Sequence, residues 1–301
     1  MKKILAIAGL CSCFQLSAQE KKESKPVEVF SSGKTINART PEMAGKGKMD
    51  FNVTHNFGDI GGSNGGIKRF FGLDNAADIR IAFTVGLSDK FDMTFARTRG
   101  GGPQQQLYEL SGKYLFMQQR ENDPSHPLSI ALFANAVVAA SPQNAKPDQE
   151  NSYDGLGERM SNVLQLIVAK RMGKVSLQVN PSFVTRGYTI SYDMKSMFAL
   201  GGAIRLPLGG RVNLILDYFH PFRNQASKDS FRIKNNIRFY DPLGVGFEIL
   251  TSGHIFRLNF TNSTEILENR FIPRTIYSWG KGQFRWGFTI SRKFNLWRDK
   301  K

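Results

Sequence analysis

The side chains that could carry out chemistry in this sequence are few and scattered. The four histidines are His55, His126, His220 and His254. No two of them have the spacing of a metal-binding helix, and a zinc site needs three or four converging ligands. No spacing brings a nucleophile, a base and an orienting group together either. The sequence therefore predicts no catalytic residue, no metal site and no cofactor, and we expect a protein that is not an enzyme.

One histidine stands in an unusual place. His55 interrupts the apolar face of an alternating segment and is followed closely by Asp59. We single out His55 and Asp59 as a motif of unknown role.

The charged residues are more informative, because many fall on the polar face of alternating segments. Nine of them share the phase of small and polar residues, and five are basic and four acidic. They are Arg80, Asp92, Glu109, Lys113, Arg205, Asp217, Glu248, Arg257 and Arg285. A selective pore usually carries rings of one sign. The near balance favours a network of ion pairs that braces an interior, and a conducting lumen is the alternative.

The segments that must position these charges show strict alternation. In Gly282–Phe294, the aromatic and aliphatic residues Phe284, Trp286, Phe288 and Ile290 alternate with polar or small ones. A period of two indicates a β-strand with two different faces. One face would contact hydrocarbon and the other water, as in a barrel wall.

The same alternation recurs in about twelve segments, which is an even strand number typical of outer-membrane barrels. The other predicted strands are 49–57, 78–87, 90–98, 107–117, 128–138, 160–170, 174–185, 196–206, 211–220, 240–250 and 254–262. Short turns and long loops alternate between them, as in a membrane barrel with periplasmic turns and outer loops. The predicted fold is therefore all-β: one closed antiparallel transmembrane barrel. A soluble sandwich or soluble barrel, with the apolar faces inward, is the alternative.

Two glycine-rich segments fall in the predicted long loops. Neither Gly61–Gly66 nor Gly100–Gly102 has the lysine and hydroxyl ending of a phosphate loop. We expect both to be outer loops, and Gly61–Gly66 could fold inward as a constriction.

The N-terminus has the features of an export signal. Two lysines, the apolar run Ile4–Leu10 and small residues ending at Ala18 predict a signal peptide over 1–18. Both cysteines, Cys11 and Cys13, would be removed with it, although acylation of Cys13 in a lipoprotein is an alternative. Residues 19–48 are expected to be a polar, partly disordered periplasmic segment. The barrel is expected over 49–297, followed by a basic tail over 298–301.

The net charge of +16 is spread along the chain. Nucleic-acid binding needs a clustered basic stripe, and no such stripe is present, so we expect no nucleic-acid partner. No stretch approaches the roughly 18 apolar residues of a transmembrane helix.

Two parts of the chain also carry a family resemblance. The first includes Thr54–Asp59 and Phe70–Asp74, and the second includes Tyr240–Leu243, Gly253–Phe256 and Gly287–Arg292. Together they resemble an uncharacterised outer-membrane β-barrel family of Gram-negative envelopes, known as a domain of unknown function. The resemblance implies a membrane barrel and no assigned activity.

We therefore expect an exported protein of a Gram-negative outer membrane. The favoured role is a narrow channel or uptake barrel for a small polar or anionic solute. A sealed structural or docking barrel, whose outer loops bind a partner or lipopolysaccharide, is the alternative, and a membrane enzyme is a second one. The expected partners are outer-membrane lipid and lipopolysaccharide, the barrel-assembly machinery and a small solute.

Overall fold

The computed structural model describes residues 24–297. The predicted signal peptide, its cleavage after Ala18, both cysteines and the basic tail 298–301 lie outside the described residues. The strands are β1 (Lys48–Asp59), β2 (Ala76–Ser88), β3 (Phe91–Gly100), β4 (Gln106–Met117), β5 (Ser129–Ala139), β6 (Met160–Met172), β7 (Val175–Arg186), β8 (Ser196–Gly209), β9 (Val212–Pro221), β10 (Leu243–Leu250), β11 (Ile255–Thr261) and β12 (Arg285–Asn295). The helices are η1 (Ile67–Gly72), α1 (Leu156–Arg159), α2 (Gln225–Asn235), α3 (Glu268–Arg274) and η2 (Trp279–Lys281).

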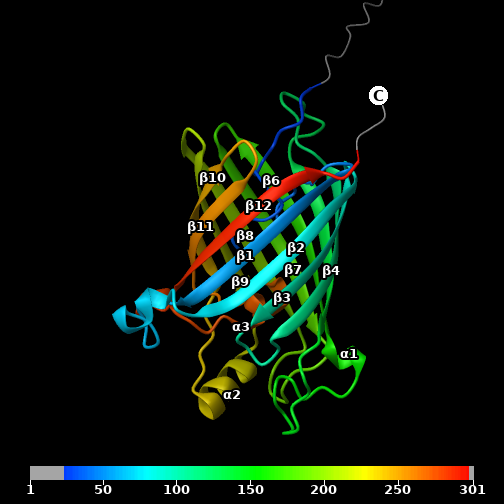
Figure 1. The fold of residues 1–301 in the computed structure, drawn as a ribbon. Helices are drawn as coiled ribbons and strands as arrows, with labels where there is room; N and C mark the ends of the chain where they lie inside the picture. Colours follow the sequence, from blue (N-terminus) through cyan, green and yellow to red (C-terminus); the bar gives the residue numbers. More distant parts are fainter. Residues whose placement is uncertain (1–23, 298–301) are drawn as a thin grey trace, which may run out of the picture.

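The strands form one closed antiparallel barrel in sequence order (Figure 1). The barrel closes where β1 pairs with β12, with Met49 opposite Phe294 and Val53 opposite Ile290. The predicted fold class and the strand number are therefore confirmed. The strands predicted at 240–250 and 282–294 begin three residues later, at Leu243 and Arg285. Among the described residues, no helix is both long and apolar enough to cross a membrane.

Each strand alternates between the lumen and the outside because successive side chains in a strand point to opposite faces. In β2, Phe83 is 40% exposed while its neighbour Ala82 is 1% exposed. In β12, Arg285, Thr289 and Ser291 are buried, as the period of two predicts. The outer wall therefore presents apolar side chains, and the lumen presents polar ones.

The two rims of the barrel differ in their connections. β2–β3, β6–β7, β8–β9 and β10–β11 are joined by short turns at one rim, where the described chain also begins and ends (Figure 1). The long connections with helices lie at the other rim. Short turns mark the periplasmic side of bacterial barrels. We therefore call the two ends the periplasmic rim and the outer rim.

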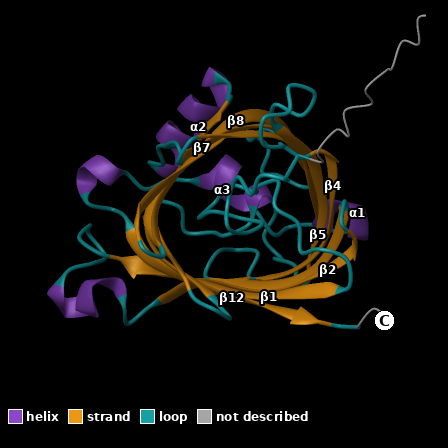
Figure 2. Cartoon of the chain, turned by 90° about the horizontal axis from the view of Figure 1, so that it is seen from above, coloured by secondary structure: helices purple, strands orange, loops and turns teal. Residues whose placement is uncertain are grey.

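The view along the barrel shows that loops fill the interior (Figure 2). One of them is the chain before β1, residues 26–47, which we call the plug. Its residues Val29, Ala38 and Thr40 are fully buried. The expectation of a partly disordered periplasmic lead-in over 19–48 is therefore wrong for the plug. The few apolar residues of this polar segment pack inside the barrel and hold it there.

The second inserted loop is the connection between β11 and β12. Sequence analysis placed it among the outer loops, but Leu267, Phe271 and Ile272 are almost completely buried and α3 lies within the barrel (Figure 2). By contrast, the glycine-rich segment 61–66 is exposed or half-buried beside η1. The suggested constriction by Gly61–Gly66 is therefore not observed, and the β11–β12 loop narrows the lumen instead.

Candidate functional site

All nine predicted lumen charges point into the barrel. Eight of them are less than 9% exposed, and the Arg205 side chain is 13% exposed. They come from eight strands, β2 to β4 and β8 to β12. The phase of each strand brings them together, as the alternation predicts.

Most of these charges are paired across the lumen wall. An Nη of Arg80 lies 2.6 Å from an Oε of Glu109, and Nε of Arg257 lies 3.2 Å from an Oε of Glu248. Arg205 approaches Glu248 at 3.8 Å. Such pairing offsets the cost of removing each charge from water.

The arginine of β12 is held differently. Arg285 donates a hydrogen bond of 2.7 Å to Oγ1 of Thr264 and lies 4.4 Å from the ring centre of Tyr277. It makes no ion pair with a carboxylate among the described residues. Its partners belong to the inserted β11–β12 loop, so this charge anchors the loop.

The plug enters and leaves the barrel at the periplasmic rim. Pro26 forms a β-bridge with Arg120 of the β4–β5 turn. At the other end, the backbone N–H of Lys46 donates a hydrogen bond of 3.0 Å to Asp89 in the β2–β3 turn. Both rim contacts involve periplasmic turns, so the plug is a loop that reaches into the lumen and returns.

The inner end of the plug is bound by Asp217 of β9, which is fully buried. One carboxylate oxygen accepts hydrogen bonds from the hydroxyl of Thr35 at 2.7 Å and from three consecutive backbone N–H groups, Ile36 to Ala38. The other oxygen accepts one from the Asn37 side chain at 2.9 Å. Successive N–H groups of this kind form a concave site for an anion. We call Asp217 with residues 35–38 the latch.

A glycine of the next strand makes room for the latch. A Cβ on Gly244 of β10 would lie 2.8 Å from Asp217 and 2.9 Å from Ile36. Any larger residue there would push the plug away from the carboxylate.

The plug and the β11–β12 loop meet inside the lumen at Glu268 of α3. Its carboxylate lies 2.7 Å from Nε of Arg39 and 3.3 Å from Nζ of Lys34, both in the plug. Arg39 also reaches Glu109 of β4 at 3.1 Å. We call Lys34, Arg39, Glu109 and Glu268 the junction, because they join the plug, the wall and the inserted loop.

Burial and ion pairing act in opposite directions at the junction. Burial lowers the pKa of Lys34 to about 8, although Glu268 opposes the shift. Burial alone would raise the pKa of Glu268, but Arg39 and Lys34 overcome it and hold that pKa at about 2. Glu268 is therefore ionised at neutral pH, and the two inserted segments attract each other.

The largest apolar contact of the plug is with one side of the barrel, and Met43 packs against a smaller cluster on β4 to β6. In the larger contact, the plug residues Val27, Val29, Phe30 and Ala38 form an apolar cluster with wall residues of β6 to β9, including Phe219, and with Phe271 and Ile272 of the inserted loop. We call this contact the seat.

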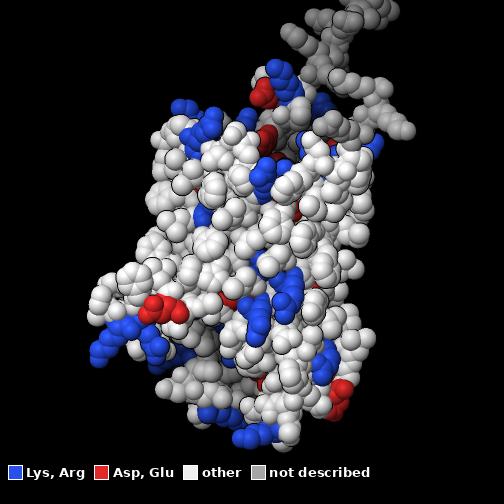
Figure 3. Space-filling view, in the orientation of Figure 1, with Lys and Arg blue, Asp and Glu red and all other residues white. Residues whose placement is uncertain are grey.

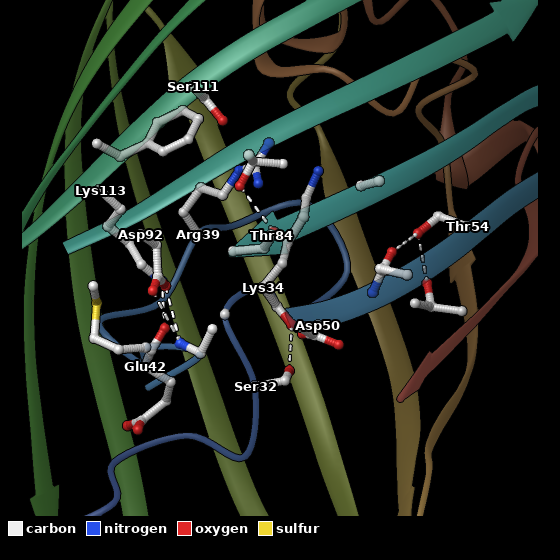
Figure 4. Close-up of a pocket in the computed structure, with 18 of the residues that line it drawn as sticks. Ser32, Lys34, Arg39, Glu42, Asp50, Thr54, Thr84, Asp92, Ser111 and Lys113 are labelled. Atoms are coloured by element: carbon white, nitrogen blue, oxygen red, sulfur yellow. Dashed lines mark hydrogen bonds and ion pairs between the residues drawn. The ribbon is translucent and has the colours of Figure 1, made fainter. Parts of the chain in front are cut away.

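A polar cavity of about 50 Å³ lies between the plug and the wall, where it is lined mainly by β1 to β4 and β12, with Phe133 of β5 and Arg257 of β11 (Figure 4). Hydroxyl groups of Thr54, Thr84, Thr94 and Thr289 line its wall side. Six basic and three acidic residues also line it, and carboxylates directly behind pair with several of the bases. We call this cavity the slot.

Residues 263–266, which we call the strap, do not line the slot but lie toward the outer rim from it, beside Asn56 of β1 and Asp78 of β2. Asn56 of β1 donates a hydrogen bond of 3.1 Å to the carbonyl of Thr264, and Asp78 of β2 accepts one of 2.8 Å from the N–H of Ile266. With Arg285, three wall side chains hold the strap by polar contacts. The rest of the β11–β12 loop is held by buried apolar residues, including Leu267 and Phe271.

The motif of unknown role divides between two places. His55 faces outward, and its ring lies 4.0 Å from that of Phe57 in an edge-on contact. Asp59 is buried at the outer end of β1 and accepts a hydrogen bond of 3.1 Å from the N–H of Gly62. The structure does not bring the two side chains together; Asp59 shapes the turn after β1.

The other histidines lie at the rims. Nδ1 of His126 lies 2.9 Å from Asp123 and 3.0 Å from Ser125, all in one periplasmic turn. A catalytic histidine uses its two nitrogens for two partners, whereas here both partners share one nitrogen. His220 contacts Asp241 at the outer rim. In the described range 24–297, no group of three or more histidine or acidic side chains is placed to hold a metal ion.

Sequence analysis missed the latch, the junction and the strap. Asp217 was predicted to face the lumen, but its partners lie about 180 residues earlier in the chain. The one available signal was the pattern of Val27, Val29, Phe30 and Ile36, four apolar residues within an otherwise polar segment.

Comparison with known proteins gives one family. The family described as "Membrane bound beta barrel domain (DUF5777)" matches residues 30–294. This match confirms the resemblance inferred from the sequence, and its description confirms a membrane barrel. It supports the predicted location in the outer membrane of a Gram-negative bacterium, where barrels of this layout reside. No curated protein matches the chain.

Several solved structures are distantly similar to the chain. The KdgM porin is 8% identical with a TM-score of 0.48, covering 82% of this chain and 99% of its own. An outer membrane channel from Pseudomonas putida F1 is 11% identical with a TM-score of 0.48, and the match covers 86% of this chain and 100% of the channel. Outer membrane phospholipase A from Escherichia coli is 11% identical with a TM-score of 0.44, and the match covers 83% of this chain and 93% of the phospholipase. Likenesses of this degree carry no information on function.

Proposed function

The chain belongs to this family of membrane-bound β-barrel domains, and from that premise we propose that it is an outer-membrane channel, closed at rest, for small polar solutes. The observation that supports the proposal is the unequal filling of the lumen. The seat fixes the plug against β6 to β9, whereas the slot leaves the hydroxyl-lined side along β1, β2, β3 and β12 unpacked.

The slot supplies a route that does not require the plug to leave. Its wall residues Thr54, Thr84 and Thr289 offer donors and acceptors that can replace the hydration of a passing solute. The seat is apolar and buried, so releasing it exposes hydrocarbon to water. The strap is held mainly by polar contacts, which water can replace, and Ile266 is its one buried apolar side chain. We therefore expect the strap to open more readily than the seat.

The solute class follows from the lining of the slot. The six basic residues exceed the three acidic ones, but Glu109, Glu248 and Glu268 pair with Arg80, Arg257 and Arg39 from behind. The electrostatic field inside the slot is therefore close to neutral, with a modest preference for anions. A cavity of about 50 Å³ holds only a few water molecules, so a solute passes only after the slot widens.

Planar-bilayer recording of the full chain tests this proposal. The wild-type protein should show rare conductance steps, and the double variant Asn56→Ala with Asp78→Ala should show frequent ones, because both changes release the strap. Gln143→Ala, in the β5–β6 outer loop, is the control and should behave as wild type. Frequent large steps in the wild type would contradict a closed resting state.

A second function, a sealed structural barrel, is favoured by the latch and the junction. Five hydrogen bonds to Asp217 and two ion pairs to Glu268 hold the plug firmly in place. If neither the wild type nor the strap variant conducts while both insert as folded barrels, the sealed barrel is the correct function.

We propose no catalytic role. Insertion by the barrel-assembly machinery also stays a prediction, based on Phe294 and Trp297 near the end of the described chain.

A further inference from the structure

The outer wall carries charged side chains at one place where hydrocarbon contact is expected. On β3, Arg97 and Arg99 point outward and are exposed, immediately after the exposed Phe95. Residues two apart in a strand share a face, so the two guanidinium groups lie side by side near the outer end of β3. Figure 3 shows basic side chains gathered at this place on the wall.

The two arginines lie on the outer half of β3, and their long side chains can extend along the wall toward the lipid headgroups. Arg97 is opposite Tyr108 of β4, and its guanidinium lies 5.9 Å from the Tyr108 ring. Tyrosine is enriched at the interface between lipid and water. A basic residue on the lipid face costs about 2–4 kcal/mol at the midplane and close to 0–1 near the interface. Contact with headgroups would therefore lower the cost of two basic residues on this face.

No protein group in the described part of the chain neutralises these arginines. Neither forms an ion pair or a side-chain hydrogen bond among residues 24–297, and the outward positions of β1 to β4 carry no carboxylate. Two unpaired guanidinium groups side by side match a phosphate, whose oxygens each accept a hydrogen bond.

A second element projects over the lipid from the same face. The loop around η1 extends sideways from the outer ends of β1 and β2 (Figure 1) and exposes Ile67, Phe70 and Phe71 by 74%, 59% and 45%. Lys68 and Arg69 lie among these apolar residues, and Asp74 is the acidic residue of the loop. Basic and aromatic residues in one short element are typical of a segment that lies in a membrane interface.

The backbone of this loop supports the same interpretation. Phe70 and Phe71 have φ angles of +44° and +52°, in the left-handed region. That conformation costs about 1–2 kcal/mol for a residue with a Cβ. In this loop the strained backbone also leaves two aromatic rings exposed to solvent. Burial of the rings in the acyl region of a membrane would offset the conformational cost.

We propose that Arg97 and Arg99, together with the η1 loop, bind the phosphorylated headgroup of a lipid in the outer leaflet. The arginines contact a headgroup phosphate. The η1 loop covers the lipid, with Phe70 and Phe71 against its chains and Lys68 and Arg69 toward its charged groups. This site lies on the outside of the barrel and is independent of conduction through the slot.

The test uses the full chain refolded in neutral detergent. The probes are phosphatidylcholine vesicles that contain bisphosphorylated lipid A, vesicles that contain its dephosphorylated form, and inorganic phosphate alone. Native mass spectrometry measures the lipid retained on the protein. The wild type should retain the phosphorylated lipid and lose it as salt rises, because salt screens exposed charges.

The variant Arg97→Gln with Arg99→Gln should retain it about 30-fold more weakly, since each basic residue near an anionic surface contributes about 1 kcal/mol and 1.4 kcal/mol is tenfold. Phe70→Ser with Phe71→Ser should weaken retention of both lipids. Lys228→Gln with Arg238→Gln removes two exposed charges from the loop between β9 and β10 and is the matched control.

Heat-modifiable electrophoretic mobility, in which heated and unheated samples are compared, shows whether each variant is a folded barrel. Equal retention of dephosphorylated lipid, an equal loss in the control variant, or full competition by inorganic phosphate would each overturn the proposal.

Discussion

Asp217 concentrates more interactions than any other lumen charge described above. It accepts five hydrogen bonds from four consecutive plug residues while fully buried. Hydrogen bonds to a charged group are worth more than neutral ones, and buried donors left without an acceptor are costly. One side chain of the wall therefore determines whether the inner end of the plug stays in place.

Asp217→Ala should release the inner end of the plug. Each orphaned N–H costs about 1–3 kcal/mol, so the free energy that protects residues 35–38 should fall by about 3 kcal/mol or more. Hydrogen exchange of these amides measures it. Asp217→Asn keeps one acceptor oxygen, so the protection of these amides in that variant should be intermediate between the wild type and the alanine variant. Unchanged exchange in the alanine variant would show that the seat and the junction hold the plug without the latch.

Glu42 should make the plug sensitive to pH. Its carboxylate accepts hydrogen bonds from the N–H groups of Val29 and Phe30, but burial raises its pKa from 4.5 to about 7. A raised carboxyl pKa means that the folded state favours the protonated form. This contribution to stability is complete below pH 4.5 and is lost as pH rises through about 7.

The measurement is proteolysis of the plug across this range. Cleavage in the wild type should accelerate as pH rises, and Glu42→Gln, which stays neutral, should show a flat profile. Lys34 does not affect the result. Its pKa is lowered from 10.5 to about 8, so its titration changes the stability only between these two pH values. A wild-type profile as flat as that of the glutamine variant would rule out this role for Glu42.

At the scale of the elements, the wall could be predicted and its filling could not. A strand that separates lipid from water carries its phase in its own residues, as Phe83 and Ala82 show. The plug has no such local signal. Its position depends on Asp217 and Glu268, which lie far away in the sequence, and on a seat shared by four strands. The slot and the strap exist only after those contacts form.

The phase of the wall predicts a depth-dependent cost for charge. Phe83→Arg, in the middle of β2, should destabilise the barrel by about 2–4 kcal/mol. Leu177→Arg also faces outward but lies near the periplasmic start of β7, so about 0–1 kcal/mol is expected. Ala82→Ser, on the slot face, is the control and should change little. Urea unfolding in phospholipid vesicles measures all three, and equal costs for both arginine variants would refute the assigned depth.

At the scale of the whole molecule, the two inserted segments reach into the lumen from opposite rims and meet at Glu268. The plug comes from the periplasmic rim and the β11–β12 loop from the outer rim (Figures 1 and 2). Lys34 and Arg39 contact Glu268 across this meeting point. A change at the outer surface can therefore reach the periplasmic side through this carboxylate, as well as through the seat and the hydrogen bond of 2.9 Å from Nζ of Lys34 to the carbonyl of Ile266.

Glu268→Ala should loosen both segments together. It leaves Lys34 and Arg39 partly unpaired in a buried site, which costs about 3–5 kcal/mol. Faster hydrogen exchange is expected in residues 34–40 as well as in α3. Glu265→Gln is the control, because Glu265 pairs with Arg270 and Arg274 at the outer end and does not contact the plug. A response limited to α3 would show that the two segments are not coupled through Glu268.

The return of the plug to the rim from which it starts has a consequence for biogenesis. Pro26 and Lys46 are both tied to periplasmic turns, so no free end has to be threaded through the ring of strands. The wall can be completed while its interior is still vacant and be filled later, from inside the cell envelope. The plug can also be withdrawn through the periplasmic rim, without opening the seam between the first and last strands.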